Sequence, residues 1–130
     1  MARPVKWGLD SFPLDVNFFG NRKIGRLRRK HGVNGVMLYL QILCYLYKKG
    51  YYLDYNGDLV FDLSYVMRLS EEETSDMILS MISFGLFDKV IFKNRRVLSS
   101  KSIQMRYLVA KKNLSKDKLI DEELDLISDL

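Results

Sequence analysis

The chain has 130 residues, of which 48% are hydrophobic, and this size and composition fit one globular domain with a single core. No stretch reaches the roughly 18 uninterrupted apolar residues of a membrane span, and the basic N-terminus lacks the apolar segment of a signal peptide. The formal net charge of +5 is uneven: residues 1–50 hold ten Lys and Arg against two acids, and residues 51–130 hold eleven against fourteen. We therefore expect a cytoplasmic protein whose basic first third suits a polyanion.

The first predicted helix spans residues 15–30, and either Asp15 or Asn17 can cap it. The residues before it include both prolines and are expected to form an extended, aromatic-rich arm. Ile24 and Leu27 share one face of the helix. The opposite face carries five cations, namely Arg22, Lys23, Arg26, Arg29 and Lys30. The pattern predicts a helix with one apolar side and one basic side.

The second predicted helix, residues 33–50, follows a stop at His31-Gly32 and is apolar on nearly every side as far as Lys48. A helix of this kind is expected at the centre of the core. Cys44 lies within it, and a lone cysteine in an apolar run indicates a buried residue in a reducing compartment. His31 ends the first helix on its apolar side, so a capping or buried histidine is favoured over a catalytic one.

A short strand is predicted at 51–54, followed by two consecutive helices at 59–68 and 71–84. Asp58 is expected to cap the first of these helices. Ser70 is expected to cap the second, with a glutamate at the capping-box position three residues later. The two helices are interpreted as a helix-turn-helix pair.

The helix 71–84 is amphipathic, but it carries four acids and no Lys or Arg. Its outward face is predicted to hold Glu72, Asp76, Ser80 and Ser83. Affinity for duplex DNA depends mainly on neutralising phosphates, so an acidic helix in the major groove would weaken binding. We interpret this helix as structural or protein-contacting. Base reading remains the alternative, because carboxylates can accept from cytosine amino groups when cations elsewhere hold the protein on DNA.

After Gly85, two strands are predicted at about 90–93 and 97–99, around an Asn94-Arg95-Arg96 turn. The turn is basic through Lys93, Arg95 and Arg96. A basic wing can lie along the DNA backbone or enter the minor groove. A hairpin turn that only aids solubility is the alternative.

The order of elements predicts a mainly α fold with a small β-hairpin: a winged helix-turn-helix with an additional N-terminal helix and a C-terminal helix at 102–112. Residues 1–112 are assigned to this domain and its arm, and residues 113–130 to an acidic amphipathic tail or the start of a linker. The tail carries a thin apolar stripe formed by Ile120, Leu124 and Ile127. Such a stripe suits folding on a partner, with a packed last helix or a frayed end as the alternatives.

Four blocks of the sequence resemble the DnaD-like N-terminal domain of phage and Gram-positive replication-initiation proteins, or replisome organisers. The blocks are GLDSFPLDVNFF (8–19), RKIGRLRRKHG (22–32), GYYLDY (50–55) and GLFDK (85–89). The resemblance covers about residues 1–112. It implies a winged-helix fold, a role in loading replication proteins onto DNA, and self-association. It implies no individual site residue.

The sequence contains no P-loop, GxGxxG, CxxC or HExxH motif, and one His and one Cys do not make a usual metal site. We therefore expect no catalysis, no metal and no cofactor. The favoured function is a DNA-binding accessory module of replication, acting on duplex or single-stranded DNA through phosphate contacts of the basic helix and the wing.

A second interpretation, from a different class, is a protein–protein module without significant DNA binding. It would self-associate, or dock a helicase loader or host protein, through Glu72, Asp76 and the tail stripe. A transcriptional regulator is less favoured, because it would need a polar or basic recognition helix and 71–84 offers none.

Overall fold

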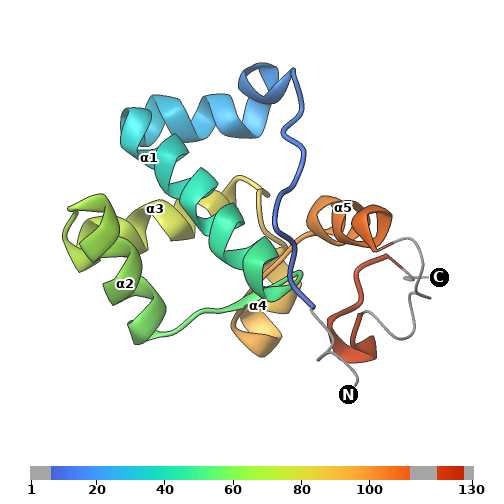
Figure 1. The fold of residues 1–130 in the computed structure, drawn as a ribbon. Coiled ribbons are helices and arrows are strands. Elements are labelled where there is room, and N and C mark those ends of the chain that lie inside the picture. Colours follow the sequence, from blue (N-terminus) through green and yellow to red (C-terminus); the bar gives the residue numbers. More distant parts are fainter. Residues whose placement is uncertain (1–6, 112–119, 128–130) are drawn as a thin grey trace.

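The computed structural model describes residues 7–111 and 120–127 (Figure 1). In chain order the elements are η1 (Phe18–Gly20), α1 (Arg22–Lys49), β1 (Leu53–Asp54), α2 (Gly57–Met67), α3 (Glu71–Ser83), α4 (Lys89–Arg95), β2 (Val97–Leu98), α5 (Lys101–Ala110) and η2 (Glu122–Leu124). Over these residues the fold is mainly helical, with five α-helices and one two-stranded antiparallel sheet. None of the described helices is long and apolar enough to cross a membrane.

Helix α1 contains both of the first two predicted helices and bends sharply between them (Figure 1). The bend is at Gly32, whose φ of 71° and ψ of −161° are not helical and whose positive φ favours glycine. The predicted stop is thus confirmed as a kink. The helix begins later than predicted, because Asn21 caps it by accepting from the Lys23 amide at 2.8 Å, while Asp15 accepts a hydrogen bond in the turn before η1.

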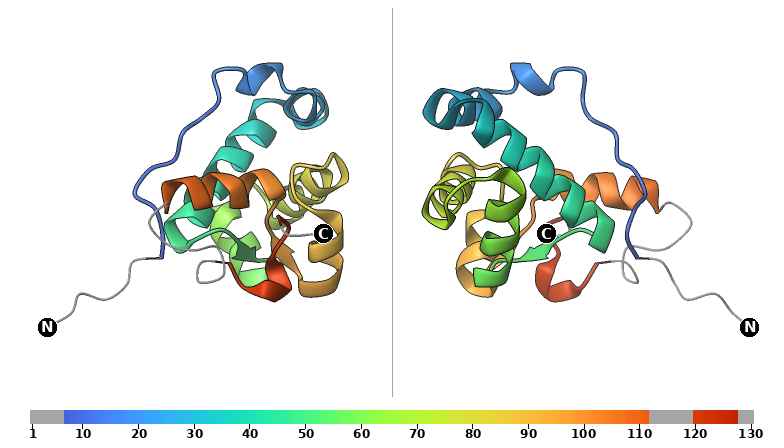
Figure 2. Two further views of the ribbon diagram at one scale, coloured as in Figure 1. Left: turned by 90° about the vertical axis from the view of Figure 1, so that its right-hand side faces the viewer. Right: turned by 60° about the vertical axis from the view of Figure 1, so that its left-hand side comes forward.

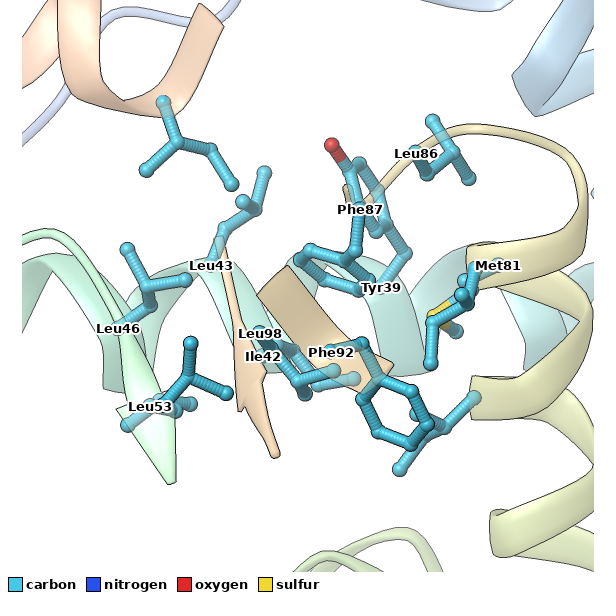
Figure 3. Close-up of a cluster of buried hydrophobic side chains, with 14 of the residues drawn as sticks. Tyr39, Ile42, Leu43, Leu46, Leu53, Met81, Leu86, Phe87, Phe92 and Leu98 are labelled. Carbon is cyan, nitrogen blue, oxygen red and sulfur yellow. The ribbon is translucent and has the colours of Figure 1, made fainter. Parts of the chain in front are cut away.

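The second half of α1 supplies the centre of the core. Its fully or almost fully buried apolar side chains are Leu38, Ile42, Leu43 and Leu46. Figure 3 shows Ile42 beside Leu98 of β2 and Phe92 of α4, and Leu46 near Leu53 of β1. The core therefore joins segments that lie far apart in the sequence.

One face of this helix is exposed, which the sequence did not predict. Val33 is 66% and Met37 50% exposed, and Cys44 is exposed as well. These positions fall on one side of a helix, and α2, α3 and β1 pack on its other sides. The prediction of a buried Cys44 is therefore wrong.

Helices α2 and α3 lie at the positions predicted for the helix pair and pack against each other. Ser70 caps α3 as predicted and accepts from the Glu73 amide at 3.0 Å. The cap of α2 is Asn56, which accepts from the Leu59 amide at 2.9 Å, and Asp58 lies in the first turn, where its charge favours the helix dipole.

The predicted wing hairpin is wrong, because its first strand and its turn form helix α4. The Asp88 carboxylate caps this helix by accepting from the Ile91 amide at 2.9 Å. Helical geometry buries Ile91 and Phe92 together, and the helix ends where Arg96 takes a left-handed φ of 54°. The β-branched run that favoured a strand is overridden by this cap and this burial.

The second predicted strand does form, as β2, but it pairs with β1. Leu53 lies opposite Leu98, and Asp54 lies opposite Val97. The small sheet is therefore a long-range antiparallel pair rather than a local hairpin, which a sequence pattern cannot distinguish.

Both ends of the described chain pack on this core. Figure 2 shows the N-terminal arm, in blue, running down one side of the molecule. There the Leu9 amide donates to the Tyr47 carbonyl at 2.7 Å, and the Phe12 ring stacks on the Tyr47 ring at 4.7 Å. Ile120 and Leu124 are buried in the same core.

Candidate nucleic-acid interface

The inner face of the first half of α1 packs against the protein core. Ile24 and Leu27 are 2% and 0% exposed, as the periodicity predicted. At the kink, His31 Nε2 lies 2.8 Å from the Ser80 hydroxyl oxygen of α3. Burial lowers the pKa of His31, the nearby Lys30 charge lowers it further, and Asp76 opposes both. The histidine is thus a neutral, hydrogen-bonded anchor of the helix.

The outer face of this half-helix is basic and exposed, as predicted. Its centre is a stripe of three exposed arginines, Arg22, Arg26 and Arg29. None of the three has a carboxylate within ion-pair distance among the described residues. We call these three residues the arginine stripe. Guanidinium groups on successive turns of one rigid helix can each bind a phosphate, bidentately where the geometry allows.

The two predicted lysines flank the arginine stripe on the side of the α3–α4 connection. The Lys23 ammonium donates to the Gly85 carbonyl at 3.1 Å, and the Lys30 ammonium lies 5.9 Å from the centre of the Phe84 ring. Both are exposed, but these contacts orient them along the protein surface.

Arg28 is an exposed cation of the same half-helix that the sequence prediction did not include. The helical projection places it between the basic and the apolar face. The run RLRRK itself is the signal that would have found it.

The second predicted basic group does not join the first. Lys93, Arg95 and Arg96 are exposed, but they lie at the end of α4 instead of at a hairpin tip. Arg95 forms an ion pair with Glu123 at 2.7 Å, and the Arg96 guanidinium lies 4.9 Å from the centre of the Phe92 ring. In Figures 1 and 2, α3 lies between α4 and the first half of α1. The structure thus shows two separate basic patches, and the one on α4 is partly neutralised.

The outward face of α3 is acidic, as predicted, with one correction. Glu72 and Asp76 are exposed, whereas Ser80 is only 4% exposed and contacts His31. Ser83 is exposed as predicted, and Leu79 is exposed as well. The first half of α1 covers the Ser80 side of α3, which no pattern within α3 indicates.

The apolar residues of the predicted tail face the protein itself. Ile120 and Leu124 are buried in the core, and Ile127 is partly buried against it. In this structure the stripe predicted to contact a partner is thus occupied by intramolecular packing. The predicted boundary at 112–113 lies outside the described residues.

Comparison with known proteins places the chain in a family. A family model described as Lin1244/Lin1753-like, N-terminal, matches residues 12–103, which is more than half of the chain. The chain belongs to this Lin1244/Lin1753-like family. The match includes the kinked α1 with its arginine stripe, the helices α2 to α4 and both strands. The resemblance to DnaD-like domains remains a prediction.

A curated relative of this Lin1244/Lin1753-like chain is an uncharacterized phage-related protein, Lin1244/Lin1753, of Listeria innocua serovar 6a. The two are 27% identical over 110 residues, which cover 85% of this chain and 36% of the relative. The chain thus spans about a third of that relative's length. No solved structure matches the chain. Within the described residues, no group of three or more His, Cys, Asp or Glu side chains is arranged to hold a metal ion.

Proposed function

We propose that the chain is a non-catalytic DNA-binding module of a phage- or prophage-type replication initiation protein. The observation that carries the proposal is the arginine stripe: three exposed guanidiniums without ion-pair partners among the described residues, on a helix fixed by Ile24 and Leu27. The phage-related relative and the sequence blocks resembling replisome organisers support the replication context.

In this proposal the arginine stripe contacts the phosphate backbone, with Arg28 and Lys30 at its edges. Phosphate contacts position a protein without reading bases, so binding is expected to tolerate any sequence. The acidic face of α3 repels phosphate, so in this proposal it lies away from the bound DNA. We also propose that α1, α2, α3 and the β1–β2 pair form a winged-helix core in which α4 stands where the wing would be.

The test is fluorescence anisotropy of labelled duplex and single-stranded oligonucleotides across a salt series. Each neutralised phosphate contributes about −0.9 to the slope of log Kobs against log salt for duplex, so three to five contacts give a slope of roughly −2.7 to −4.5. Reversing the arginine stripe (R22E, R26E, R29E) is expected to abolish binding at moderate salt. The matched control reverses three exposed lysines near α4: Lys89→Glu, Lys93→Glu and Lys101→Glu. Absence of binding at low salt, or equal loss in both triple variants, would refute the proposal.

A second candidate function, self-association, is favoured by an exposed aromatic face on α2. Phe61 is 55% and Tyr65 77% exposed, and their rings stack at 6.4 Å. With Tyr45 and Lys48 of α1 they border a groove of about 570 Å³. Exposed apolar clusters of this kind mark interaction sites more often than free surface.

The partner in this second function is a second copy of the chain. Sedimentation velocity across protein concentrations should show a dimer that the double variant Phe61→Ser, Tyr65→Ser loses, while its DNA binding stays unchanged. A protein that remains monomeric at high concentration would remove this candidate. The double charge reversal Glu72→Lys, Asp76→Lys then tests whether the acidic face of α3 contributes to any association observed.

A further inference from the structure

A small pocket lies where the N-terminal arm, η1, the first half of α1 and α5 meet. Its volume is about 110 Å³, which is room for three or four waters at roughly 30 Å³ each, or for one tetrahedral oxyanion. Six residues of its lining have side chains that can donate hydrogen bonds, namely Asn17, Asn21, Lys23, Tyr39, Ser102 and Arg106. Neither the arginine stripe nor the aromatic face of α2 belongs to it.

Tyr39 is the buried polar group of this pocket. The residue is 6% exposed, and its ring lies 6.3 Å from Phe18 and 5.6 Å from Phe87. Figure 3 shows its oxygen turned away from the apolar cluster around Ile42. The hydroxyl has no hydrogen-bond partner among the described residues, and it opens onto the pocket instead of being sealed in the core. Burial raises the pKa of Tyr39 to about 12, so the hydroxyl keeps its proton and can donate it.

Two cations face the same space. The half-buried Arg106 guanidinium lies near Tyr39 and Tyr47 and opposes the rise that burial causes in the pKa of each hydroxyl. The Lys23 ammonium is held at the pocket by the Gly85 carbonyl, 3.1 Å away. Neither cation has an ion pair among the described residues.

One carboxylate also lines the pocket. Asp15 is exposed and accepts the Asn17 amide at 2.8 Å, and it lies outside ion-pair distance of both cations. The lining therefore holds two cations against one carboxylate, with a tyrosine hydroxyl that opens onto the pocket and can donate a hydrogen bond. This charge and this donor suit an anion with several acceptor oxygens better than a neutral ligand.

We propose that this pocket is a binding site for a single phosphate group, with Tyr39, Arg106 and Lys23 as its donors. The phosphate comes either from solution, as inorganic phosphate, or from the backbone of bound DNA. Only the second source rests on the proposed function. In both cases the bound anion ties α5 to the first half of α1 and accepts a hydrogen bond from the Tyr39 hydroxyl.

The first experiment is calorimetric titration of the full chain with inorganic phosphate, with chloride keeping the ionic strength constant. We expect saturable binding at one site. Tyr39→Phe removes only the hydroxyl and Arg106→Gln only the charge, and each is expected to weaken binding by about tenfold or more. Tyr52→Phe, a half-buried tyrosine outside the pocket, is the matched control and is expected to bind as the wild type does.

Circular dichroism and the unfolding midpoint show whether each variant keeps its fold. If Arg106→Gln does not fold, Tyr39→Phe alone decides, because phenylalanine preserves the ring packing. Absence of saturable phosphate binding by the wild type would overturn the proposal. An unchanged Kd in a folded Tyr39→Phe would also overturn it.

A second experiment identifies the source of the phosphate by measuring DNA binding of the same variants. If Tyr39→Phe weakens both phosphate and DNA binding, the pocket receives a backbone phosphate. If it weakens phosphate binding alone, the pocket takes free phosphate, and the proposal stands without DNA. The R22E, R26E, R29E variant separates the two proposals, since it should lose DNA and still bind inorganic phosphate.

Discussion

At the scale of single residues, Gly8 shows how a close crossing of two segments selects one residue type. The arm crosses the last turn of α1 there, and a Cβ on Gly8 would lie 1.6 Å from the Lys48 carbonyl oxygen. The next residue, Leu9, donates its amide to Tyr47 at 2.7 Å and so keeps the arm in place. The sequence shows a glycine in an extended arm, and only the structure shows what it touches.

Replacing this glycine gives a first prediction. Gly8→Ala is expected to reduce the free energy of unfolding by about 1–3 kcal/mol, because the backbone must move to make room for the methyl group. The matched control is Gly25→Ala, at an exposed helical position where a Cβ meets nothing within 4 Å. It should raise stability by up to about 1 kcal/mol through helix propensity. Chemical denaturation of both variants checks this, and changes of the same sign would contradict it.

His31 gives a pH-dependent prediction. Its pKa in the folded protein is lowered below the ordinary 6.5, mainly by burial, so the unfolded chain binds the proton more readily. Its contribution to stability is therefore complete above pH 6.5 and is lost as the pH falls from 6.5 through the folded pKa. Urea unfolding at pH 7.5, 6.5 and 5.5 should show a loss of stability on acidification that is smaller in His31→Gln. Identical pH profiles for the two proteins would contradict this role.

At the scale of elements, α4 is the segment whose structure differs most clearly from the one that its sequence pattern predicted. The sequence VIFK has the β-branched and aromatic composition of a strand, and it lies beside residues that suit a turn. The Asp88 cap and the joint burial of Ile91 and Phe92 make the segment helical. The Ser70 cap was predicted correctly because a periodic apolar pattern follows it, and α4 is too short to display such a pattern.

The cap of α4 gives a third prediction. Asp88→Ala removes the acceptor for the Ile91 amide and is expected to cost about 1 kcal/mol of stability. Asp62→Ala, which removes an exposed carboxylate from the middle of α2, is the matched control and should change stability by less than about 0.5 kcal/mol. Thermal unfolding followed by circular dichroism compares the two. Equal unfolding midpoints for the two variants would mean that tertiary contacts alone hold α4.

At the scale of the whole molecule, one buried amide joins the last described segment to the core. Gln104 of α5 is fully buried. Its amide nitrogen donates to the Leu124 carbonyl at 2.8 Å, and its carbonyl accepts from the Leu126 amide at 2.8 Å. The Tyr51 hydroxyl accepts from the Asp121 amide at 2.8 Å. Residues 120–127 are thus held by side-chain hydrogen bonds to their backbone as well as by apolar burial.

This arrangement gives a fourth prediction. Gln104→Ala leaves backbone groups of Leu124 and Leu126 without partners and is expected to cost roughly 2 kcal/mol. Met105→Ala, at the neighbouring exposed position, should cost much less. Hydrogen exchange of residues 120–127 should accelerate in Gln104→Ala alone. Unchanged exchange would show that burial of Ile120 and Leu124 is sufficient to hold the segment.

Part of the candidate interface was predictable from helical periodicity, and the rest depends on tertiary contacts. The basic outer face and the apolar inner face of the first half of α1 follow from helical periodicity, and they are found as predicted. The separation of this face from the basic end of α4, and the Arg95–Glu123 ion pair, depend on how distant segments pack. No spacing along the chain could have shown them.

Features that depend on near neighbours can be read from the chain alone: the helical periods, the Ser70 cap, the break at Gly32 and the basic and apolar faces of the first half of α1. Steric limits on φ and the helical repeat act within a few residues, so they are readable from the chain. Long-range packing, in contrast, pairs β1 with β2, leaves Cys44 exposed and brings Tyr39, Arg106 and Lys23 to one pocket. These features depend on which surfaces come together, and burial against distant segments outweighs the small differences in local propensity.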